Sequence, residues 1–179
     1  MSLKIIDVAG LKKSGKTTVV ENIVSELKAR GYKIGTVKKI HIPGFTIDQE
    51  GKDTYRHKQA GAEFVISLAP EEVALIRELH GQRSLAEIMD LVPTDTDFLV
   101  CEELNEKRDD VLYIITLKTI DALNETLNVR NVGTKIVAIS GVVSNSQDDQ
   151  VTNGKYPIIN STTSNGIKRL VDLILNDFK

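Results

Sequence analysis

Apolar residues along the chain recur in two patterns, short uninterrupted runs and longer stretches with helical spacing. The runs are rich in Ile, Leu and Val and predict buried strands at residues 3–9, 32–39, 63–68, 98–101, 111–117, 135–140 and 157–160. The helical spacing predicts helices at residues 17–30, 54–60, 85–91, 120–127 and 166–178. Strands and helices alternate, which predicts an α/β fold with a mostly parallel sheet and helices on both faces.

Two helix starts carry capping signals. Ser84 and Glu87 have the spacing of a capping box and predict the start of the helix at 85–91. Asp53 stands directly before the helix at 54–60, and we expect its side chain to cap that helix.

Two segments need further interpretation. Residues 72–79, which His80-Gly81 ends, fit a helix or a strand equally well, and we interpret them as a strand. The strand at 32–39 is short enough to return beside the strand at 3–9, so that the two form a βαβ unit with the helix between them.

The turn after the first strand carries the most informative motif. Gly10, Gly15, Lys16 and Thr17 fill the pattern G-x-x-x-x-G-K-[ST], in which backbone N–H groups and the start of a helix surround a triphosphate. Lys16 would reach the β- and γ-phosphates, and the Thr17 hydroxyl would bind Mg²⁺. The residues expected at the nucleotide are Gly10, Lys12, Lys13, Ser14, Gly15, Lys16, Thr17 and Thr18. The sequence therefore predicts the three-layer sandwich of a P-loop NTPase.

An acid follows the buried strand at 98–101. A carboxylate at the end of such a strand is where a Walker B residue holds the Mg²⁺ shell or positions water. We assign this role to Glu102 rather than Glu103, with Thr17 as the second metal ligand. Alternatively, both acids only begin the charged loop that extends to Asp110.

Other candidates lie near the same edge of the sheet. Lys38, Lys39 and His41 follow the second strand, where they would face the nucleotide phosphates or form a solvated basic turn. Asn145 follows a late strand and is a candidate for reading guanine, with an ordinary turn residue as the alternative. The N-K-x-D pattern of many GTPases is missing from the chain.

The charged segment at residues 47–62 is expected to border the nucleotide and to act as a switch. Asp48 is a further candidate catalytic acid, beside Glu102. The candidates for a partner or switch surface are Lys52, Asp53, Arg56 and His57. The alternative is a solvated helix whose charges serve solubility.

Length, composition and charge limit the number of domains, the classes of partner and the compartment. The 179 residues suffice for one domain, and we expect a single P-loop domain over 1–179. A net charge of −2 with interspersed signs favours neither nucleic acid nor a membrane surface as a partner. The single Cys101 and the lack of a signal peptide or spanning segment indicate the cytoplasm.

The chain resembles the molybdopterin-guanine dinucleotide biosynthesis protein B family (MobB). Four blocks carry the resemblance: Gly10-Leu11-Lys12-Lys13-Ser14-Gly15-Lys16-Thr17-Thr18, Gly31-Tyr32-Lys33-Ile34-Gly35-Thr36-Val37-Lys38, Ile47-Asp48-Gln49-Glu50-Gly51-Lys52-Asp53-Thr54-Tyr55-Arg56-His57 and Ala60-Gly61-Ala62. The chain departs from the family at the acidic strand end. The family pattern there is Val-Glu-Gly-Phe-Lys, whereas this chain has Cys101-Glu102-Glu103-Leu104-Asn105.

The resemblance implies a homodimeric GTP-binding protein with GTP and Mg²⁺ as ligands and slow GTPase activity. Such a protein would assist the guanylyltransferase that attaches GMP to molybdopterin, and molybdopterin-carrying proteins would be further partners. Two alternatives remain. A P-loop small-molecule kinase needs an Arg-rich lid, whereas Arg77, Arg83 and Arg108 are scattered. A metal-insertion GTPase needs Cys and His ligand pairs, which this sequence does not contain.

Overall fold

The chain forms two compact units, which are described separately below. The computed structural model describes residues 3–78, 84–147, 151–152 and 155–178. The larger unit comprises Met1–Lys39 and Ser84–Lys179, and the smaller one Ile40–Arg83. The P-loop belongs to the larger unit, and the assignment of 1–179 as one domain stays a prediction.

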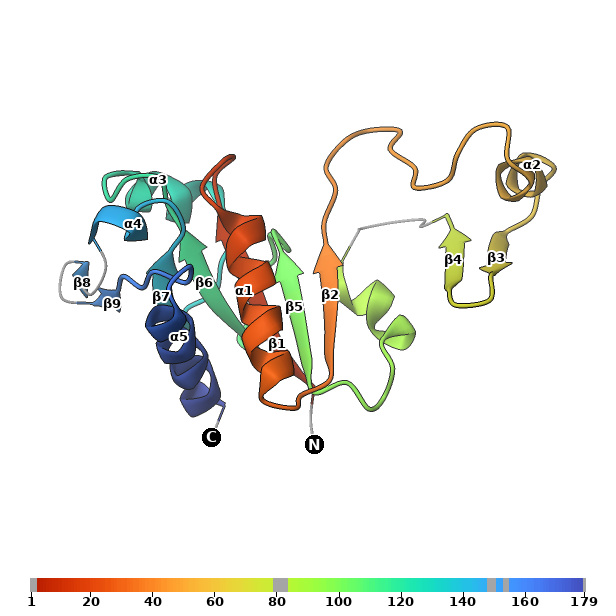
Figure 1. Cartoon of the computed structure of the whole chain (residues 1–179). Coiled ribbons are helices and arrows are strands. Elements are labelled where there is room, and N and C mark those ends of the chain that lie inside the picture. The colour runs from red at the N-terminus through yellow and green to blue at the C-terminus, as the bar shows by residue number, and fades with distance from the viewer. Residues whose placement is uncertain (1–2, 79–83, 148–150, 153–154, 179) are drawn as a thin grey trace. The chain divides into compact units, whose positions relative to one another are not determined.

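A five-stranded parallel sheet forms the centre of the larger unit, with the strand order β2-β5-β1-β6-β7 (Figure 1). Its strands are β1 (Lys4–Gly10), β2 (Ile34–Lys38), β5 (Phe98–Glu102), β6 (Val111–Thr116) and β7 (Ile136–Ser140). Every residue of β5 and β6 is buried, as the uninterrupted apolar runs predict. The predicted α/β class is confirmed.

Helices cover both faces of this sheet. The apolar sides of α1 (Lys16–Ala29) and α5 (Ser164–Asp177) pack on one face, against side chains such as Ile6 and Val8. On the other face, α3 (Ala122–Val129) and the 3₁₀ helix η1 (Leu85–Leu91) pack near Ile5 and Ala9. The short elements α4 (Ser144–Gln147), β8 (Val151–Thr152) and β9 (Tyr156–Pro157) follow β7.

The structure corrects three sequence predictions in this unit. Strand β2 lies beside β5, not beside β1, because the fully buried β5 needs a neighbour on each side, whereas the mixed β2 is suited to an edge. The segment that begins at Ser84 is a 3₁₀ helix, although the predicted capping box is present and the Ser84 N–H donates to Glu87 Oε2 at 2.8 Å. The strand predicted at 157–160 shrinks to β9 and a single bridge between Ile158 and Ile139.

The smaller unit consists of α2 (Asp53–Gln59) and an antiparallel hairpin of β3 (Phe64–Leu68) and β4 (Val73–Arg77). The strand assignment for 72–79 is confirmed over β4, whereas His80-Gly81 lies outside the described residues. The expected cap is wrong, since Lys52 is the N-cap and Asp53 is the first helical residue. The Asp53 charge instead lies in the first turn, where the helix dipole favours an acid.

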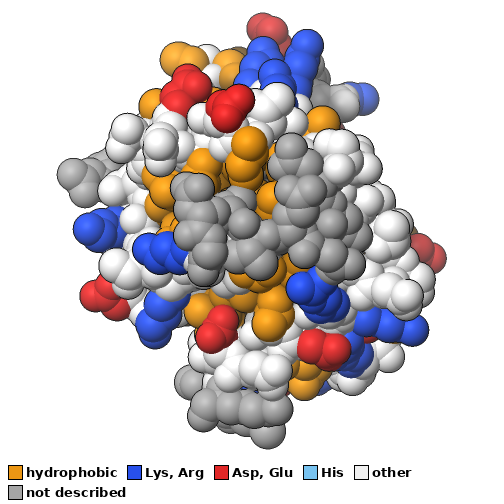
Figure 2. All heavy atoms as spheres, turned by 90° about the vertical axis from the view of Figure 1, so that its left-hand side faces the viewer, with side chains coloured by type: hydrophobic (Ala, Val, Ile, Leu, Met, Phe, Trp, Pro, Cys, Tyr) orange, Lys and Arg blue, Asp and Glu red, His pale blue; other side chains and the backbone are white. Residues whose placement is uncertain are grey.

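The surface of the larger unit is mixed. On the face shown in Figure 2, hydrophobic side chains gather near the middle and charges of both signs lie around them. Among the residues that the structure describes, no helix is both long and apolar enough to cross a membrane.

Candidate functional site

The turn between β1 and α1 requires its glycines. Gly10 ends β1, and a Cβ on this residue would collide with Thr116 and with the Ser14 hydroxyl. Gly15 is the N-cap of α1 with a φ of 95°, a left-handed conformation that glycine adopts at no steric cost. Helix α1 therefore begins at Lys16, and its first N–H groups, which have no partner within the helix, point toward the turn.

Two strand ends hold this turn in place. The Ser14 hydroxyl is buried and shares a hydrogen bond of 2.7 Å with the Thr116 hydroxyl at the end of β6. The Val142 N–H, just past β7, donates to the Ser14 carbonyl oxygen at 3.1 Å. The turn is thus fixed against the carboxyl ends of β6 and β7 before any ligand arrives.

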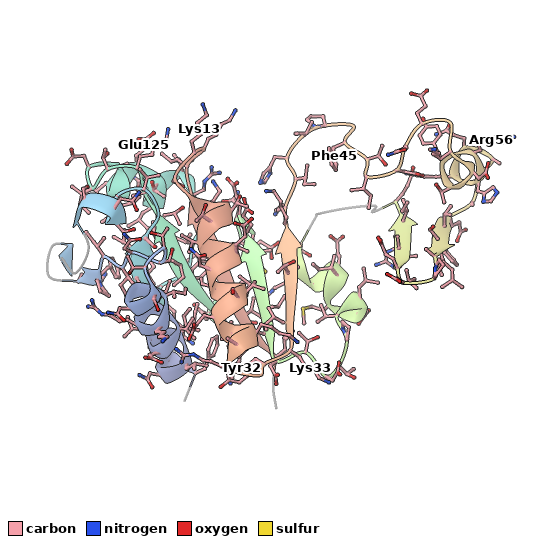
Figure 3. The ribbon with its side chains drawn as sticks, viewed as in Figure 1. Lys13, Tyr32, Lys33, Phe45, Arg56 and Glu125 are labelled. Carbon is pink, nitrogen blue, oxygen red and sulfur yellow. The ribbon has the colours of Figure 1, made fainter. Side chains whose placement is uncertain are left out.

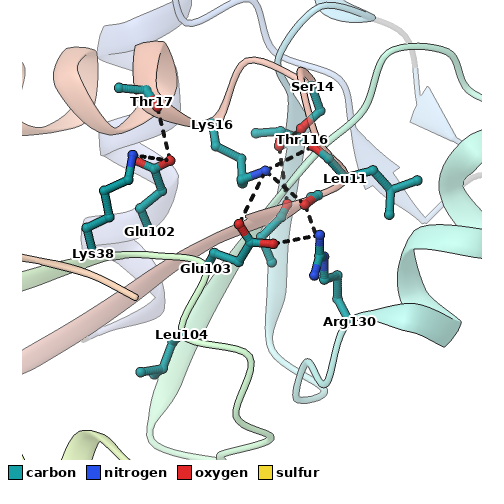
Figure 4. A network of polar contacts seen from close by, with 12 residues as sticks. Leu11, Ser14, Lys16, Thr17, Lys38, Glu102, Glu103, Leu104, Thr116 and Arg130 are labelled. Carbon is teal, nitrogen blue, oxygen red and sulfur yellow. Dashed lines mark hydrogen bonds and ion pairs between the residues drawn. The ribbon is translucent and has the colours of Figure 1, made fainter. Parts of the chain in front are cut away.

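Lys16 spans the turn from inside. It is only 8% exposed, and its Nζ donates to the carbonyl oxygens of Gly10 at 3.0 Å and Leu11 at 2.9 Å. The Glu103 carboxylate lies 3.6 Å from the same Nζ (Figure 4). The ammonium group is therefore held at a defined place by the loop's own backbone.

Thr17 and Glu102 meet across the same edge of the sheet. The Thr17 hydroxyl donates to Glu102 Oε1 at 3.0 Å, and Lys38 Nζ donates to that oxygen at 3.1 Å (Figure 4). A hydroxyl and a carboxylate are the kind of oxygen ligands that Mg²⁺ prefers. The structure thus brings together the two residues that the sequence predicts as metal ligands.

Glu103 and Arg130 are part of this network. From the sequence, Glu103 was weighed only as the rejected alternative to Glu102, and Arg130 was not considered. Arg130 Nη2 lies 2.6 Å from Glu103 Oε1, and Arg130 Nε donates to the Gly10 carbonyl oxygen at 3.1 Å. Glu103 adopts a left-handed φ of 63°, which costs about 1 kcal/mol for a residue with a Cβ. Its place at the family's glycine position was the one signal in the sequence. Nothing in the sequence pointed to Arg130.

The buried Asp7 side chain binds the backbone of the loop that follows β5. The Asp7 side chain is fully buried in β1, and its Oδ1 accepts a hydrogen bond from the Leu104 N–H at 3.0 Å. Among the described residues, Oδ2 has no hydrogen-bond partner. Burial raises the pKa of Asp7 to about 7, against the opposing effect of the backbone N–H groups, and burial likewise raises the pKa of Cys101 to about 12. Asp7 thus anchors the segment that presents Glu103.

Several predicted loop residues face solvent. Lys12, Lys13 and Thr18 are exposed, and Lys13 points outward at the end of the sheet where the P-loop lies (Figure 3). Asn145 is exposed on α4, and its backbone N–H donates to the Val142 carbonyl oxygen. Their predicted contacts with a nucleotide stay predictions.

The two lysines at the end of β2 contact the acidic end of β5 and the loop that follows it. Lys38 contacts Glu102, while Lys39 Nζ donates to the Leu104 carbonyl oxygen at 2.9 Å and lies 3.7 Å from Glu106. The Lys38 side chain is nevertheless 60% exposed, and both alternatives for these lysines, phosphate contact and a solvated basic turn, stay predictions. His41 belongs to the smaller unit.

The smaller unit contains the remaining predicted residues, Asp48, Lys52, Asp53, Arg56 and His57. Asp48 Oδ1 accepts hydrogen bonds from the Thr54 hydroxyl at 2.8 Å and the Gln49 N–H at 3.0 Å, so this acid orders the start of α2. The last four are exposed, with an ion pair of 3.6 Å between Asp53 and Arg56. Their roles at a nucleotide or a partner stay predictions.

The parallel sheet, the glycine-dependent turn before α1 and the helices on both faces define an α/β protein of the P-loop sandwich class. Residues 5–142 match the family model of MobB, described as molybdopterin guanine dinucleotide synthesis protein B. The chain belongs to the MobB family.

Individual relatives cover shorter stretches. A molybdopterin-guanine dinucleotide biosynthesis adapter protein of Haemophilus influenzae is 36% identical over 83 residues, or 46% of each chain. A relative from Methanocaldococcus jannaschii is 30% identical over 121 residues, which make up 66% of this chain and 49% of that protein. The matched stretches thus span about half the length of these curated relatives.

Solved structures show the same fold over nearly the whole chain. The crystal structure of Bacillus subtilis MobB superposes with a TM-score of 0.70 at 22% identity, covering 95% of this chain and 97% of that one. A MobB homolog from Bacillus stearothermophilus gives 0.67 at 18% identity, with coverage of 96% and 98%.

Proposed function

We propose that this chain is a cytoplasmic GTP-binding accessory protein of molybdenum cofactor biosynthesis that assists the guanylyltransferase step. Family membership and the adapter proteins among its relatives support the accessory role. The observation that carries the nucleotide-binding role is the hydrogen bond between Thr17 and Glu102 beside the P-loop. It joins a strand-end acid to the first turn of α1, where Mg²⁺ and phosphate are bound in P-loop proteins.

In this proposal each side chain has a defined task. The backbone N–H groups between Gly10 and Thr17 surround the phosphates, and Lys16 neutralises the β- and γ-phosphates. Thr17 and Glu102 hold Mg²⁺ and its water shell, and bound Mg²⁺ would neutralise charge on the phosphates. Asn145 and the charged helix α2 are the proposed contacts for the base and for the partner.

Hydrolysis by such a site should be slow. Glu102 Oε1 already accepts hydrogen bonds from Thr17 and Lys38, so little of this oxygen is left to position an attacking water. Transfer of GMP to molybdopterin would be performed by the guanylyltransferase, whereas this chain would act through its bound nucleotide.

The exposed face of the hairpin supports the proposed homodimer. Alternate residues of β3 and β4 place large apolar side chains on one face, with exposures of 57% for Phe64, 57% for Ile66, 80% for Leu68, 65% for Val73 and 40% for Leu75. Within the described part of the chain, the two strands pair only with each other, and isolated two-stranded sheets are marginally stable. A second copy would cover this apolar face.

Thermal unfolding with Mg²⁺-GTP and Mg²⁺-ATP tests the proposal. At a ligand concentration of one hundred times Kd, the nucleotide that binds the folded state should stabilise it by about 2.7 kcal/mol. Lys16→Ala should lose this stabilisation, whereas Lys28→Ala, which removes an exposed charge in the last turn of α1, serves as the control for charge. A full GTP shift in Lys16→Ala would show that the P-loop is not the site. Phosphorylation of a small molecule at the expense of GTP would favour the kinase alternative.

A further inference from the structure

Two cations and one acid surround a single carbonyl oxygen at the start of the P-loop. The Gly10 carbonyl oxygen accepts hydrogen bonds from Lys16 Nζ at 3.0 Å and from Arg130 Nε at 3.1 Å. The Glu103 carboxylate bridges the same cations, with Oε1 2.6 Å from Arg130 and Oε2 3.6 Å from Lys16 (Figure 4). The Arg130 guanidinium group therefore lies directly against the start of the P-loop.

The charges of this cluster depend on one another. The exposed fractions of the three side chains are 9% for Lys16, 18% for Glu103 and 19% for Arg130. Two cations held this close with little water between them repel each other unless an anion compensates them. Glu103 supplies that negative charge, and a phosphate group could supply it equally well.

Glu103 lies on a backbone that favours glycine. Its φ is 63°, in the left-handed region that glycine adopts without strain. Two residues later, Asn105 has a φ of 55°, and its Oδ1 accepts a hydrogen bond from the Asn131 N–H at 2.8 Å. The segment from Glu103 to Asn105 is thus attached at two points to the residues that end α3. The strained conformation is maintained by these contacts.

We propose that Arg130 is a second phosphate-binding cation of this site, and that the Glu103 carboxylate is an internal anion which a nucleotide phosphate displaces. This inference rests on the proposed nucleotide binding. The planar guanidinium group of arginine can donate two parallel hydrogen bonds to a phosphate, as it does to a carboxylate. Glu103 therefore competes with the nucleotide for Lys16 and Arg130, and it weakens nucleotide binding in this chain.

Calorimetric titration with Mg²⁺-GTP and with tripolyphosphate tests the competition. Glu103→Gln removes the charge but keeps the shape of the side chain, so we expect its Kd for both ligands to fall about fivefold, the effect of losing one partly buried ion pair. The matched control is Glu125→Gln, because Glu125 lies on α3 at the same end of the sheet as Lys13 (Figure 3). The control should stay within about twofold of the parent.

Arg130 is tested by two variants. Arg130→Met should raise the Kd for tripolyphosphate about tenfold, and Arg130→Lys should restore part of the loss because it keeps the charge. In the double variant Glu103→Gln with Arg130→Met, the gain from Glu103→Gln should shrink, since one of the two released cations is missing. Ligand-free thermal unfolding of every variant checks that the fold is retained.

The outcomes separate the two ideas. A parent that binds GTP while Glu103→Gln binds no more tightly, or Glu125→Gln gains as much, overturns this inference and leaves the proposed function intact. An Arg130→Met variant that binds tripolyphosphate as the parent does also overturns it. A parent that binds neither ligand overturns the proposed function itself.

Discussion

Thr17 and Glu102 lie 85 residues apart in the chain and share a hydrogen bond of 3.0 Å beside the P-loop. Parallel pairing of β1 with β5 creates this contact, because it aligns Val8 with Glu102 and so carries the strand-end acid to the start of α1. The pair is the natural starting point for tests of nucleotide chemistry.

Glu102→Gln should slow GTP hydrolysis by about a hundredfold while GTP binding is largely kept. The substitution preserves the shape of the side chain but removes the charge that would organise the Mg²⁺ water shell. Single-turnover hydrolysis measures the rate, and calorimetry measures the Kd. Equal turnover in variant and parent would transfer the catalytic role to Asp48 or Glu103, or to no acid of this chain.

Thr17→Ala should abolish the Mg²⁺-dependent part of GTP binding and spare much of the remainder. The hydroxyl is one metal ligand, whereas the loop's N–H groups bind phosphate without it. GTP titrations with and without Mg²⁺ give the two affinities, and Ser25→Ala, which removes an exposed hydroxyl further along α1, is the matched control. If Mg²⁺ improves binding equally in Thr17→Ala and in the parent, Thr17 is not a metal ligand.

Part of the candidate site could be predicted from the sequence. The P-loop and the end of β5 could be predicted because each is a local signal: a glycine spacing, and an acid after an apolar run. The position of β2 was mispredicted because strand order depends on which apolar edges remain to be covered, and this involves the whole chain.

The roles of Arg130 and Asp7 at the site could not be predicted. Arg130 reaches Gly10 only after α3 has packed on the sheet, and charged pairs between distant residues leave no pattern in one sequence. Asp7 lies within the apolar run at 3–9, and no pattern in the sequence marks it as a site residue. Its role in anchoring Leu104 depends on the left-handed turn at Glu103, a conformation that local propensity argues against.

Asp7 should make the protein less stable as the pH rises from about 4 to about 7. Burial raises the pKa of Asp7 in the folded protein from 3.8 to about 7, so in this range the folded state binds more protons than the unfolded state. The stabilisation that protonated Asp7 contributes is therefore fully present below the unfolded pKa. Above it, the free energy of unfolding decreases by at most about 1.4 kcal/mol per pH unit until the folded pKa is reached.

Asp7→Asn should remove this dependence, because an amide does not titrate in this pH range. The fold should be kept, since the amide oxygen can still accept the hydrogen bond from the Leu104 N–H. Urea unfolding at a series of pH values gives the free energy of unfolding, and Asp177→Asn at the exposed end of α5 is the control. Parallel pH profiles for Asp7→Asn and the parent would contradict the raised pKa.

Ile66→Glu should dissociate the proposed homodimer. Ile66 lies opposite Leu75 in the middle of the exposed apolar face of the hairpin, and burying an unpaired charge there would cost several kcal/mol. Sedimentation equilibrium of parent and variant gives the association constants. Ala69→Glu adds the same charge in the exposed turn after β3 and should leave the dimer intact. A parent that sediments as a monomer at high concentration would rule out the dimer.

The segment 47–62 should become protected from hydrogen exchange when Mg²⁺-GTP binds. Helix α2 has no buried residue, so its backbone hydrogen bonds are held by little packing and should exchange readily without ligand. Asp48 links the preceding loop to Thr54, so an ordering of the loop by phosphate would be transmitted to the charged helix. Nucleotide state would then alter the surface that a guanylyltransferase contacts.

Exchange measured by mass spectrometry with Mg²⁺-GTP, with Mg²⁺ alone and with Lys16→Ala separates the outcomes. A switch requires added protection in both 10–18 and 47–62 for the parent with GTP, and in neither for Lys16→Ala. Protection confined to 10–18 would leave the P-loop assignment standing but reduce α2 to a solvated helix whose charges serve solubility. The lysine variant makes this distinction sharp, because it removes phosphate binding in the larger unit without altering any residue of the segment whose protection is measured.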